Sequence, residues 1–318
     1  MANNLDKVIA SIKDEIPKKV YNSIAKSSPT MAMLMRKKKV WDSGGDTIKP
    51  HIKYKEAENT GSYRGYDTMD ITPQNTRTDA EFRLKQYYAS VVFNGYEKAI
   101  SSGDNAVFNL VDIAMKDAED ALKDKFATDL FGDGTGNGGK ALLGLNAAID
   151  DGTSVATYGG IPRSTYTWWK AQYDGAAAAL TIAKMRNLFM LCVRGGVENR
   201  PDFIVTDLNQ WNAYAELIDG KTNIQQIPNK TAQMFADFGF PTLHFMGIPV
   251  VYDEYCPADK MYFINSETVQ LWTKPGLDFK MTELVKPANM DAKIGQILWG
   301  GELICTEPRA NGKMENLT

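Results

Sequence analysis

A glycine-rich segment, residues 132–140, carries a pattern that could bind phosphate. It contains a G-x-x-x-x-G-K spacing that ends at Lys140 and a G-x-G-x-x-G spacing that begins at Gly134. Both motifs need a strand before them and a helix after them, so that backbone N–H groups point at the phosphate. Here a long helical pattern comes first, and Ala141 stands where a magnesium-binding Ser or Thr belongs. The context favours a flexible loop, and a nucleotide-dependent enzyme is kept as an alternative.

Other residues that could do chemistry do not form a recognisable constellation. The two histidines, His51 and His244, lie outside any H-E-x-x-H spacing. Asp253 and Glu254 are neighbours, and on a strand they would point to opposite faces, so a capped turn before Pro257 is the better interpretation. No G-x-S-x-G elbow occurs. We therefore predict no catalytic residue, no metal site and no cofactor.

The cysteines indicate neither a disulfide framework nor a zinc site. There are three, Cys192, Cys256 and Cys305, far apart and odd in number, with no C-x-x-C pair. We expect three buried free thiols that pack as small apolar side chains.

The composition is that of an ordinary globular protein. The chain has 318 residues, of which 43% are apolar and 24% charged, and its net charge is −3. No apolar run is long enough for a membrane span, and the N-terminus lacks the apolar core of a signal peptide. We therefore expect no membrane partner and a location in the cytoplasm where the chain is made.

The charges are distributed unevenly along the chain. Residues 1–100 contain 17 Lys+Arg and 12 Asp+Glu, whereas the remainder contains 19 and 27. A basic first third and an acidic body suggest that like chains meet head to tail. Ordinary scatter of surface charge is the alternative explanation.

Two alternating segments, residues 46–58 and 77–93, predict a long hairpin with a polar tip. Both strands are rich in charge and poor in core-forming residues, and an isolated ribbon is marginal in water. We expect the hairpin to lie on a neighbouring chain, where its basic residues face an acidic surface and guide docking. The candidate inter-subunit residues are Lys49, Lys53, Lys55, Arg83 and Lys85. Whether they share one face depends on the strand register.

Further along, the pattern predicts a long helix and then a mixture of elements. Apolar residues at helical spacing favour a helix over residues 104–131, about 40 Å long. A second helix is expected near residues 180–194, and a short one after Asp207. Expected strands cover residues 203–205, 243–253, 261–264, 268–273 and 294–304. Because helices and strands do not alternate regularly, the fold class is α+β.

Four segments resemble the major capsid proteins of tailed double-stranded-DNA bacteriophages. They are Gly159–Trp169, Pro201–Thr206, Phe245–Glu254 with the cysteine-proline pair after it, and Ile297–Leu303 leading to Pro308-Arg309. Together they span roughly residues 85–310. Their order and spacing, rather than any single segment, carry the resemblance.

The resemblance implies the Hong-Kong-97-like capsid fold. It divides the chain into a series of regions: an N-terminal arm (1–44), an extended β-hairpin loop (45–92), a peripheral domain (93–172) with a spine helix (104–131), an axial domain (173–259), return strands of the peripheral domain (260–300) and a C-terminal segment (301–318). Some relatives carry a scaffolding region of about a hundred residues before the hairpin. None precedes it here, so we expect a separate scaffolding protein or an already processed chain.

The same resemblance implies a structural protein without enzyme activity. It would self-assemble into the hexamers and pentamers of an icosahedral virion shell, built in the host cytoplasm. Its partners would be other copies of itself, a scaffolding protein, a portal, and packaged double-stranded DNA held without sequence specificity. An encapsulin-type nanocompartment, which shares the fold and holds a cargo enzyme, is the alternative.

Overall fold

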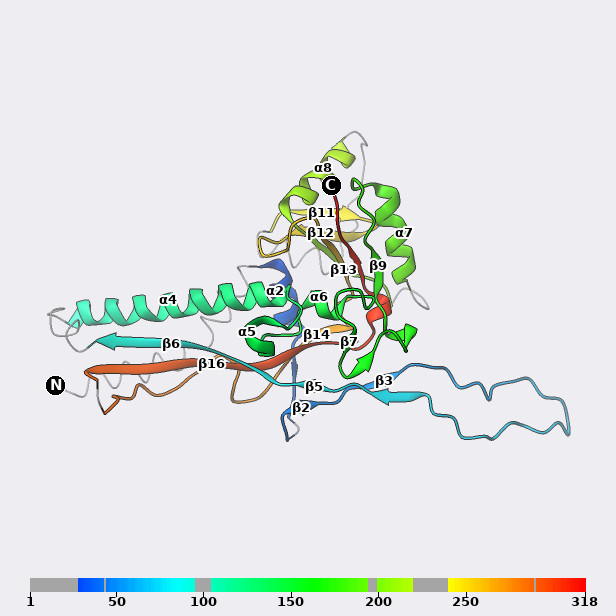
Figure 1. The fold of residues 1–318 in the computed structure, drawn as a ribbon, viewed down its shortest axis with the longest axis horizontal. Coiled ribbons are helices and arrows are strands. Elements are labelled where there is room, and N and C mark those ends of the chain that lie inside the picture. Colours follow the sequence, from blue (N-terminus) through cyan, green and yellow to red (C-terminus); the bar gives the residue numbers. More distant parts are fainter. Residues whose placement is uncertain (1–27, 43, 95–103, 194–198, 220–239, 289) are drawn as a thin grey trace.

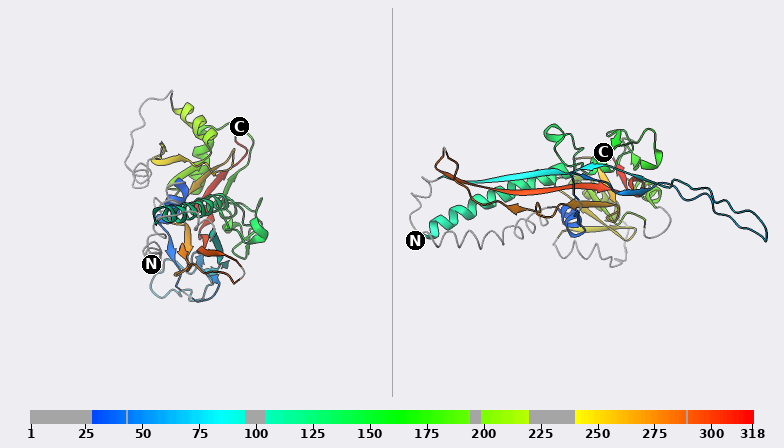
Figure 2. Two further views of the ribbon diagram at one scale, coloured as in Figure 1. Left: turned by 90° about the vertical axis from the view of Figure 1, so that its left-hand side faces the viewer. Right: turned by 90° about the horizontal axis from the view of Figure 1, so that it is seen from below.

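The computed structural model describes residues 28–42, 44–94, 104–193, 199–219, 240–288 and 290–318. The molecule is elongated (Figure 1). One long helix and two long strands form one end, a thin hairpin forms the other, and a lobe of helices and strands rises between them. The right-hand view in Figure 2, from below, also shows the long helix and strands at one end and the hairpin at the other. These described residues carry no helix that has both the length and the apolar character to cross a membrane.

Helices and strands are mixed along the chain, as the α+β prediction requires. The α-helices are α2 (Pro29–Arg36), α4 (Asp104–Leu130), α5 (Gly136–Gly139), α6 (Leu145–Ala148), α7 (Ile182–Cys192) and α8 (Leu208–Asp219), with 3-10 turns at Thr167–Trp169 and Pro308–Ala310. The hairpin strands are β2 (Thr47–Ile48), β3 (His51–Lys53), β4 (Arg77–Asp79) and β5 (Phe82–Arg83), and a small ribbon consists of β7 (Thr157–Tyr158) and β8 (Ile161–Pro162). The remaining strands are β1 (Lys39–Val40), β6 (Lys85–Asn94), β9 (Gln172–Asp174), β10 (Phe203–Thr206), β11 (Thr242–Phe245), β12 (Ile248–Tyr252), β13 (Met261–Ile264), β14 (Val269–Thr273), β15 (Lys280–Met281), β16 (Ala292–Cys305) and β17 (Gly312–Met314).

The first large sheet has the order β1-β14-β16-β15, with β6 paired to the other edge of β16. β6 and β16 stay in register over ten pairs, from Lys85↔Gly301 to Asn94↔Ala292. Tyr87, Ala89 and Val91 are buried on one face of β6, and α4 lies along the same two strands (Figure 1). The predicted hairpin, 45–92, is therefore too long, because residues 85–92 belong to this sheet.

The second sheet has the order β11-β12-β10-β13-β17-β9. Its central strand β10 alternates between two apolar clusters: Phe203 and Val205 join the core around α4, whereas Ile204 packs with α7 and α8. Apolar side chains cover both faces, which explains the uninterrupted apolar run that the sequence shows here. β13 and β17, which cover residues 261–264 and 312–314, pair within this sheet. The predicted division assigned residues 261–264 to the return strands of the peripheral domain, and in the structure they lie apart from those strands.

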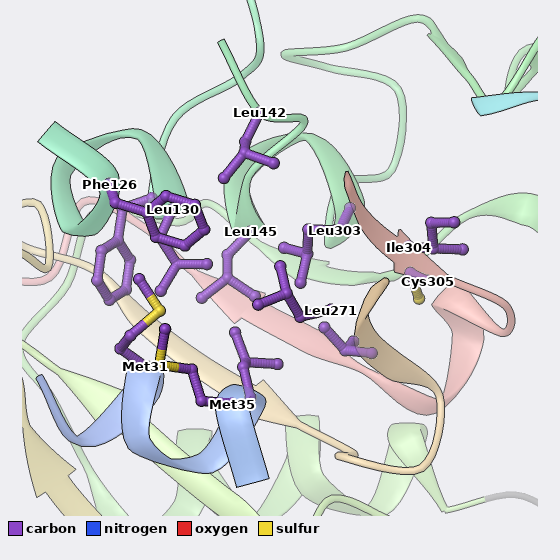
Figure 3. Packing of buried hydrophobic residues seen from close by; sticks show 14 of the residues in the cluster. Met31, Met35, Phe126, Leu130, Leu142, Leu145, Leu271, Leu303, Ile304 and Cys305 are labelled. Atoms are coloured by element: carbon purple, nitrogen blue, oxygen red, sulfur yellow. The ribbon is translucent and has the colours of Figure 1, made fainter. Parts of the chain in front are cut away.

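Helix α2 lies at the centre of the main core. Met31 and Met35 are buried against Phe126 and Leu130 of α4 and against apolar residues of β14 and β16 (Figure 3). Ser28 caps the helix by accepting a hydrogen bond from the backbone N–H of Met31. Residues 28–36 of the predicted N-terminal arm are thus part of the subunit's own core. Residues 1–27 of that arm lie outside the described residues.

Several local predictions are confirmed. The long helix covers residues 104–130, the strand prediction 261–264 agrees with β13, and Asp207 caps the turn before α8 through the N–H of Asn209. All three cysteines are buried free thiols. Burial raises the pKa of Cys305 to about 12, which keeps this thiol protonated and unreactive at neutral pH.

Candidate inter-subunit surface

The root of the hairpin is anchored in its own subunit. β2 pairs with β5 and β3 with β4 in one continuous antiparallel register. On one face Ile48, Ile52 and Phe82 are buried in the main core, and the Phe82 ring meets Tyr158 edge to face with centroids 5.0 Å apart. The hairpin, which the sequence was expected to place on a neighbouring chain, is therefore part of its own subunit's core at this root.

The same register decides where the five candidate basic residues lie. Thr47 is opposite Arg83 and Lys53 is opposite Arg77. Residues directly opposite each other share a face in an antiparallel pair. By this alternation Lys49, Lys53, Lys55 and Arg83 fall on the face opposite the buried Ile48 and Phe82. Lys85 begins β6, where the buried positions change to Tyr87 and the alternate residues up to Val91, so it does not share this face.

Three of these lysines already have acidic partners within the hairpin. Lys49 pairs with Glu81, Lys53 with Glu56 at 2.6 Å, and Lys55 with Glu58. Residues 45–92 contain seven Lys+Arg and seven Asp+Glu, so the basic excess of the first hundred residues comes from the arm. The hairpin as a whole therefore carries no net charge, and three of its lysines are paired within it.

The last two candidates differ from each other. The side chain of Arg83 is exposed and forms no ion pair within the described residues. Lys85 is half-buried at the start of β6 and donates a hydrogen bond to the carbonyl oxygen of Gly139. Arg83 is therefore available to a neighbouring chain, whereas Lys85 holds the glycine loop of its own chain.

An aromatic contact fixes the point where the hairpin leaves the body. The Tyr54 ring stacks on Trp168 with centroids 5.3 Å apart, and the Tyr54 hydroxyl donates to the carbonyl of Asn75 on the returning strand. Trp169 is fully buried, and its indole N–H donates to the Tyr158 carbonyl. Trp168 therefore anchors the hairpin, and Trp169 belongs to the core.

Beyond Tyr54 the hairpin is solvated. Every residue from 55 to 73 is exposed. The turn at the end is closed by Asp67, whose N–H donates to the Arg64 carbonyl and whose carboxylate accepts from the Arg64 N–H. Four large apolar side chains are displayed on this polar segment: Tyr63, Tyr66, Met69 and Ile71. Sequence reasoning missed them because it described the stretch only as polar, although four such residues within nine positions were a visible signal.

Several amides of the glycine loop are already hydrogen-bonded within the loop. The N–H groups of Gly139, Lys140 and Ala141 donate to carbonyl oxygens of the loop itself, and that of Thr135 donates to the Asp133 carboxylate. These amides are consumed locally, so they do not converge on an anion. The loop instead connects α4 to the core.

Side chains of the long strands hold the end of this loop. The Tyr87 hydroxyl accepts from the Leu142 N–H at 2.9 Å and donates to the Asp129 carboxylate at 2.8 Å. Glu302 accepts from the N–H groups of Leu143 and Leu303 through the same oxygen, and its other oxygen is buried without a partner. Burial raises the pKa of Glu302 to about 8.

A buried charge network joins the ribbon β7–β8 to the second sheet. The Asp150 carboxylate lies 3.0 Å from the Lys313 ammonium and 3.7 Å from the Arg163 guanidinium, and all three side chains are inaccessible to solvent. Burial raises the pKa of Asp150, but the N–H of Val155 and the charge of Lys313 outweigh it and hold the pKa below its ordinary value. Because each of these three buried charges has a partner, we interpret the network as a structural link between the ribbon and the sheet.

The remaining chemical candidates are also structural. His51 pairs with Asp79 across the hairpin, and burial lowers the pKa of His244. Asp253 is buried and accepts hydrogen bonds from the hydroxyls of Ser28 and Thr30, so it fastens the start of α2. It also accepts from the Tyr255 N–H, which confirms the predicted capped turn.

Comparison with known protein families agrees with this architecture. The chain matches the family model of the SU10 major capsid protein over residues 139–318, which is more than half of its length. The chain belongs to the SU10 major capsid protein family. A search of curated proteins finds no match to this capsid protein.

Solved capsid structures share the fold across almost the whole capsid protein. The capsid of cyanophage A-1(L) matches with a TM-score of 0.69 at 19% identity, covering 91% of this chain and 92% of the other. The capsid of the native GTA particle gives 0.58 at 13% identity, with 90% of each chain covered. The SrpI encapsulin of Synechococcus elongatus PCC 7942 gives 0.55 at 10% identity, covering 89% and 86%.

The fold is therefore the Hong-Kong-97-like capsid fold, and the protein is a structural subunit of a capsid shell. Self-assembly is its function, and the virion capsid is its location. The encapsulin match has a lower TM-score than that of cyanophage A-1(L), and the matched family is one of major capsid proteins. A phage capsid subunit is therefore better supported than the shell protein of a nanocompartment.

Proposed function

We propose that this capsid protein forms the hexamers and pentamers of an icosahedral shell around packaged double-stranded DNA. The supporting observation is the hairpin: residues 55–73 are exposed throughout, on a ribbon that the chain's own core anchors only at the root. A two-stranded ribbon of this kind gains little stability by itself. In an assembly it extends each subunit's contact area to a neighbouring copy.

The two apolar clusters of the subunit correspond to its two proposed domains. The cluster that joins α2, α4 and the first sheet is the proposed peripheral domain with α4 as its spine. The cluster beneath α7 and α8, with the second sheet, is the proposed axial domain. The hairpin is the proposed extended loop, and Lys49, Lys53, Lys55, Arg83 and Lys85 are its proposed charged contact residues. Of these, Arg83 is best placed to steer docking.

The other partners are proposals that rest on the capsid family. A separate scaffolding protein would guide curvature, and a portal would occupy one vertex. DNA would be enclosed without sequence reading, which suits a subunit with a net charge of −3. Assembly would take place in the host cytoplasm, and the subunit would act without catalysis.

Electron microscopy and light scattering of the expressed protein test this function. We expect capsomers or closed shells at working concentration. A well-behaved monomer of 35.3 kDa over a wide concentration range would contradict the proposal. Particles from the natural source should release nuclease-protected double-stranded DNA; particles that instead hold a protein cargo would favour the nanocompartment.

A further inference from the structure

The buried network around Lys313 contains a side-chain amide as well as charges. The Lys313 ammonium donates to the Asn146 amide oxygen at 2.9 Å and to the Asp150 carboxylate at 3.0 Å. It also lies 3.1 Å from the Glu315 carboxylate. Lys313 and Asp150 are inaccessible to solvent, and the side chain of Glu315 is 13% exposed. An amine, a carboxamide and two carboxylates therefore meet around one nitrogen atom.

Two separate parts of the chain bring these groups together. Lys313 lies in β17, directly opposite Tyr262 of β13 on one side and Tyr173 of β9 on the other. Its ammonium lies 5.3 Å from the centroid of the Tyr173 ring. Tyr262 is buried, and its hydroxyl has no hydrogen-bond partner among the described residues. Asn146 lies in α6, and Asp150 follows that helix. The amine is thus fixed against α6 in a place that water, the competing nucleophile, does not reach.

We propose that Lys313 and Asn146 form an isopeptide bond within the chain. The amide carbon is bonded to the very oxygen that the nitrogen already contacts, and holding two reacting groups together in this way removes much of the barrier to their reaction. The reaction is a single self-modification rather than enzyme turnover. It goes beyond the proposed function and does not depend on it, because one subunit contains every group that takes part.

The two carboxylates carry the protons of this reaction. Asp150 takes one proton from the Lys313 ammonium, and the freed amine attacks Cγ of Asn146 to form the new C–N bond. The attacking nitrogen passes a second proton to Glu315. Asp150 then gives its proton to the leaving Nδ2, the old C–N bond breaks, and ammonia departs with the proton from Glu315. One amide replaces another, nothing is oxidised or reduced, and a single ammonium ion is released.

The network can lose the charge of the lysine without leaving a carboxylate unpaired. Asp150 keeps the Arg163 guanidinium at 3.7 Å, and Glu315 keeps the Lys260 ammonium at 2.7 Å. A buried carboxylate left without a cation would be costly, and this arrangement avoids that cost. The two linked residues are 167 positions apart. The bond therefore closes a long loop, joins the C-terminal strand to the core permanently, and restricts the unfolded chain.

Mass spectrometry of the full chain tests for the bond. Under denaturing conditions the expressed protein should be lighter by one ammonia than the mass that its sequence encodes, after allowance for removal of Met1. Trypsin should leave residues 141–163 joined to residues 310–318, with Lys313 uncleaved. The joined peptide distinguishes the isopeptide bond from a cyclised asparagine, which has the same mass loss without a link. A chain of full mass, or two separate peptides, overturns the proposal.

Conservative variants test the individual groups. K313R keeps a buried cation and N146A removes the acceptor carbon, so both should have the full encoded mass and no joined peptide. K260R is the matched control, because Lys260 also contacts Glu315, and it should keep the link. E315Q cannot take up a proton, so the linked fraction of freshly synthesised chains should fall at least about tenfold. A joined peptide in N146A would contradict the assignment of the acceptor, and an unchanged linked fraction in E315Q would contradict the role of Glu315.

Discussion

The indole of Trp168 stacks on the ring of Tyr54 with an interplanar angle of 24°. Tyr54 is the last half-buried residue of the first hairpin strand before the continuously exposed segment begins. The stack therefore sets the direction in which the hairpin leaves the body. In a shell, a small error at this root would be multiplied over the length of the ribbon.

Replacing Trp168 should loosen the hairpin more than the body. We expect W168A to lower the free energy of unfolding by about 1–3 kcal/mol, from lost burial and lost stacking. Hydrogen exchange at residues 75–79 should speed up, and particle yield should fall. W168F is the control that retains an aromatic face. Unchanged exchange in W168A would mean that the stack does not order the root.

Much of the fold could be predicted from local pattern. The spine helix was recognisable because apolar residues recur at helical spacing up to Leu130, and β13 because four apolar residues follow one another between turns. α2 was missed as a core helix because its burial depends on Phe126 and Leu130 of α4, which are remote in sequence. Periodicity cannot reveal such a partner.

The contact residues were harder to predict for the same reason. Alternation showed that charged residues recur at every second position of the hairpin strands. Whether they share a face, and whether Lys49 meets Glu81, depends on register, which only the folded ribbon defines. The exposure of Tyr88 could not be predicted either, because Tyr88 and the buried Tyr87 look alike in sequence. Which of them is buried follows from the side on which α4 lies.

The buried carboxyl of Glu302 should make subunit stability depend on pH. Its pKa rises from an ordinary value of 4.5 to about 8 in the folded state, so the folded chain binds this proton more tightly than the unfolded chain. The stabilisation is complete below pH 4.5 and is lost as the pH rises towards 8. The total loss is on the order of a few kcal/mol.

E302Q tests this linkage, because glutamine stays neutral and keeps an oxygen for the N–H groups of Leu143 and Leu303. Urea unfolding of free subunits across pH 5 to 9 should show a flatter profile for the variant. At pH 9 the variant should be more stable than wild type. Parallel profiles would show that Glu302 is ionised in the folded chain throughout this range.

The glycine loop should tolerate loss of its lysine. Lys140 is exposed, and the amides around it are already bonded within the loop. K140A should therefore fold, assemble and melt like wild type, within about 0.5 kcal/mol, as exposed substitutions usually do. Isothermal titration with ATP and magnesium should detect no binding to either protein. Micromolar affinity that disappears in K140A would reinstate the phosphate-loop interpretation.

Charge reversal at Arg83 can separate an effect on docking between subunits from an effect on the stability of the free subunit. Arg83 is exposed and forms no ion pair within the described residues. R83E should leave the melting temperature of the free subunit nearly unchanged, because an exposed charge adds little to stability. If Arg83 meets an acidic surface of a neighbour, assembly should slow, and added salt should narrow the difference from wild type.

K85E is the contrasting variant. Lys85 binds the Gly139 carbonyl, and its charge favours ionisation of the nearby Glu302. A glutamate at position 85 would remove that hydrogen bond and set a second carboxyl beside a buried one. We therefore expect K85E to lower the melting temperature of the subunit itself, by several degrees for a loss of about 1–2 kcal/mol. The experiment compares thermal melting with the light-scattering rate of assembly for both variants. Should R83E melt early while its surviving subunits assemble at the wild-type rate, Arg83 would belong to the subunit's own stability and would have no part in docking.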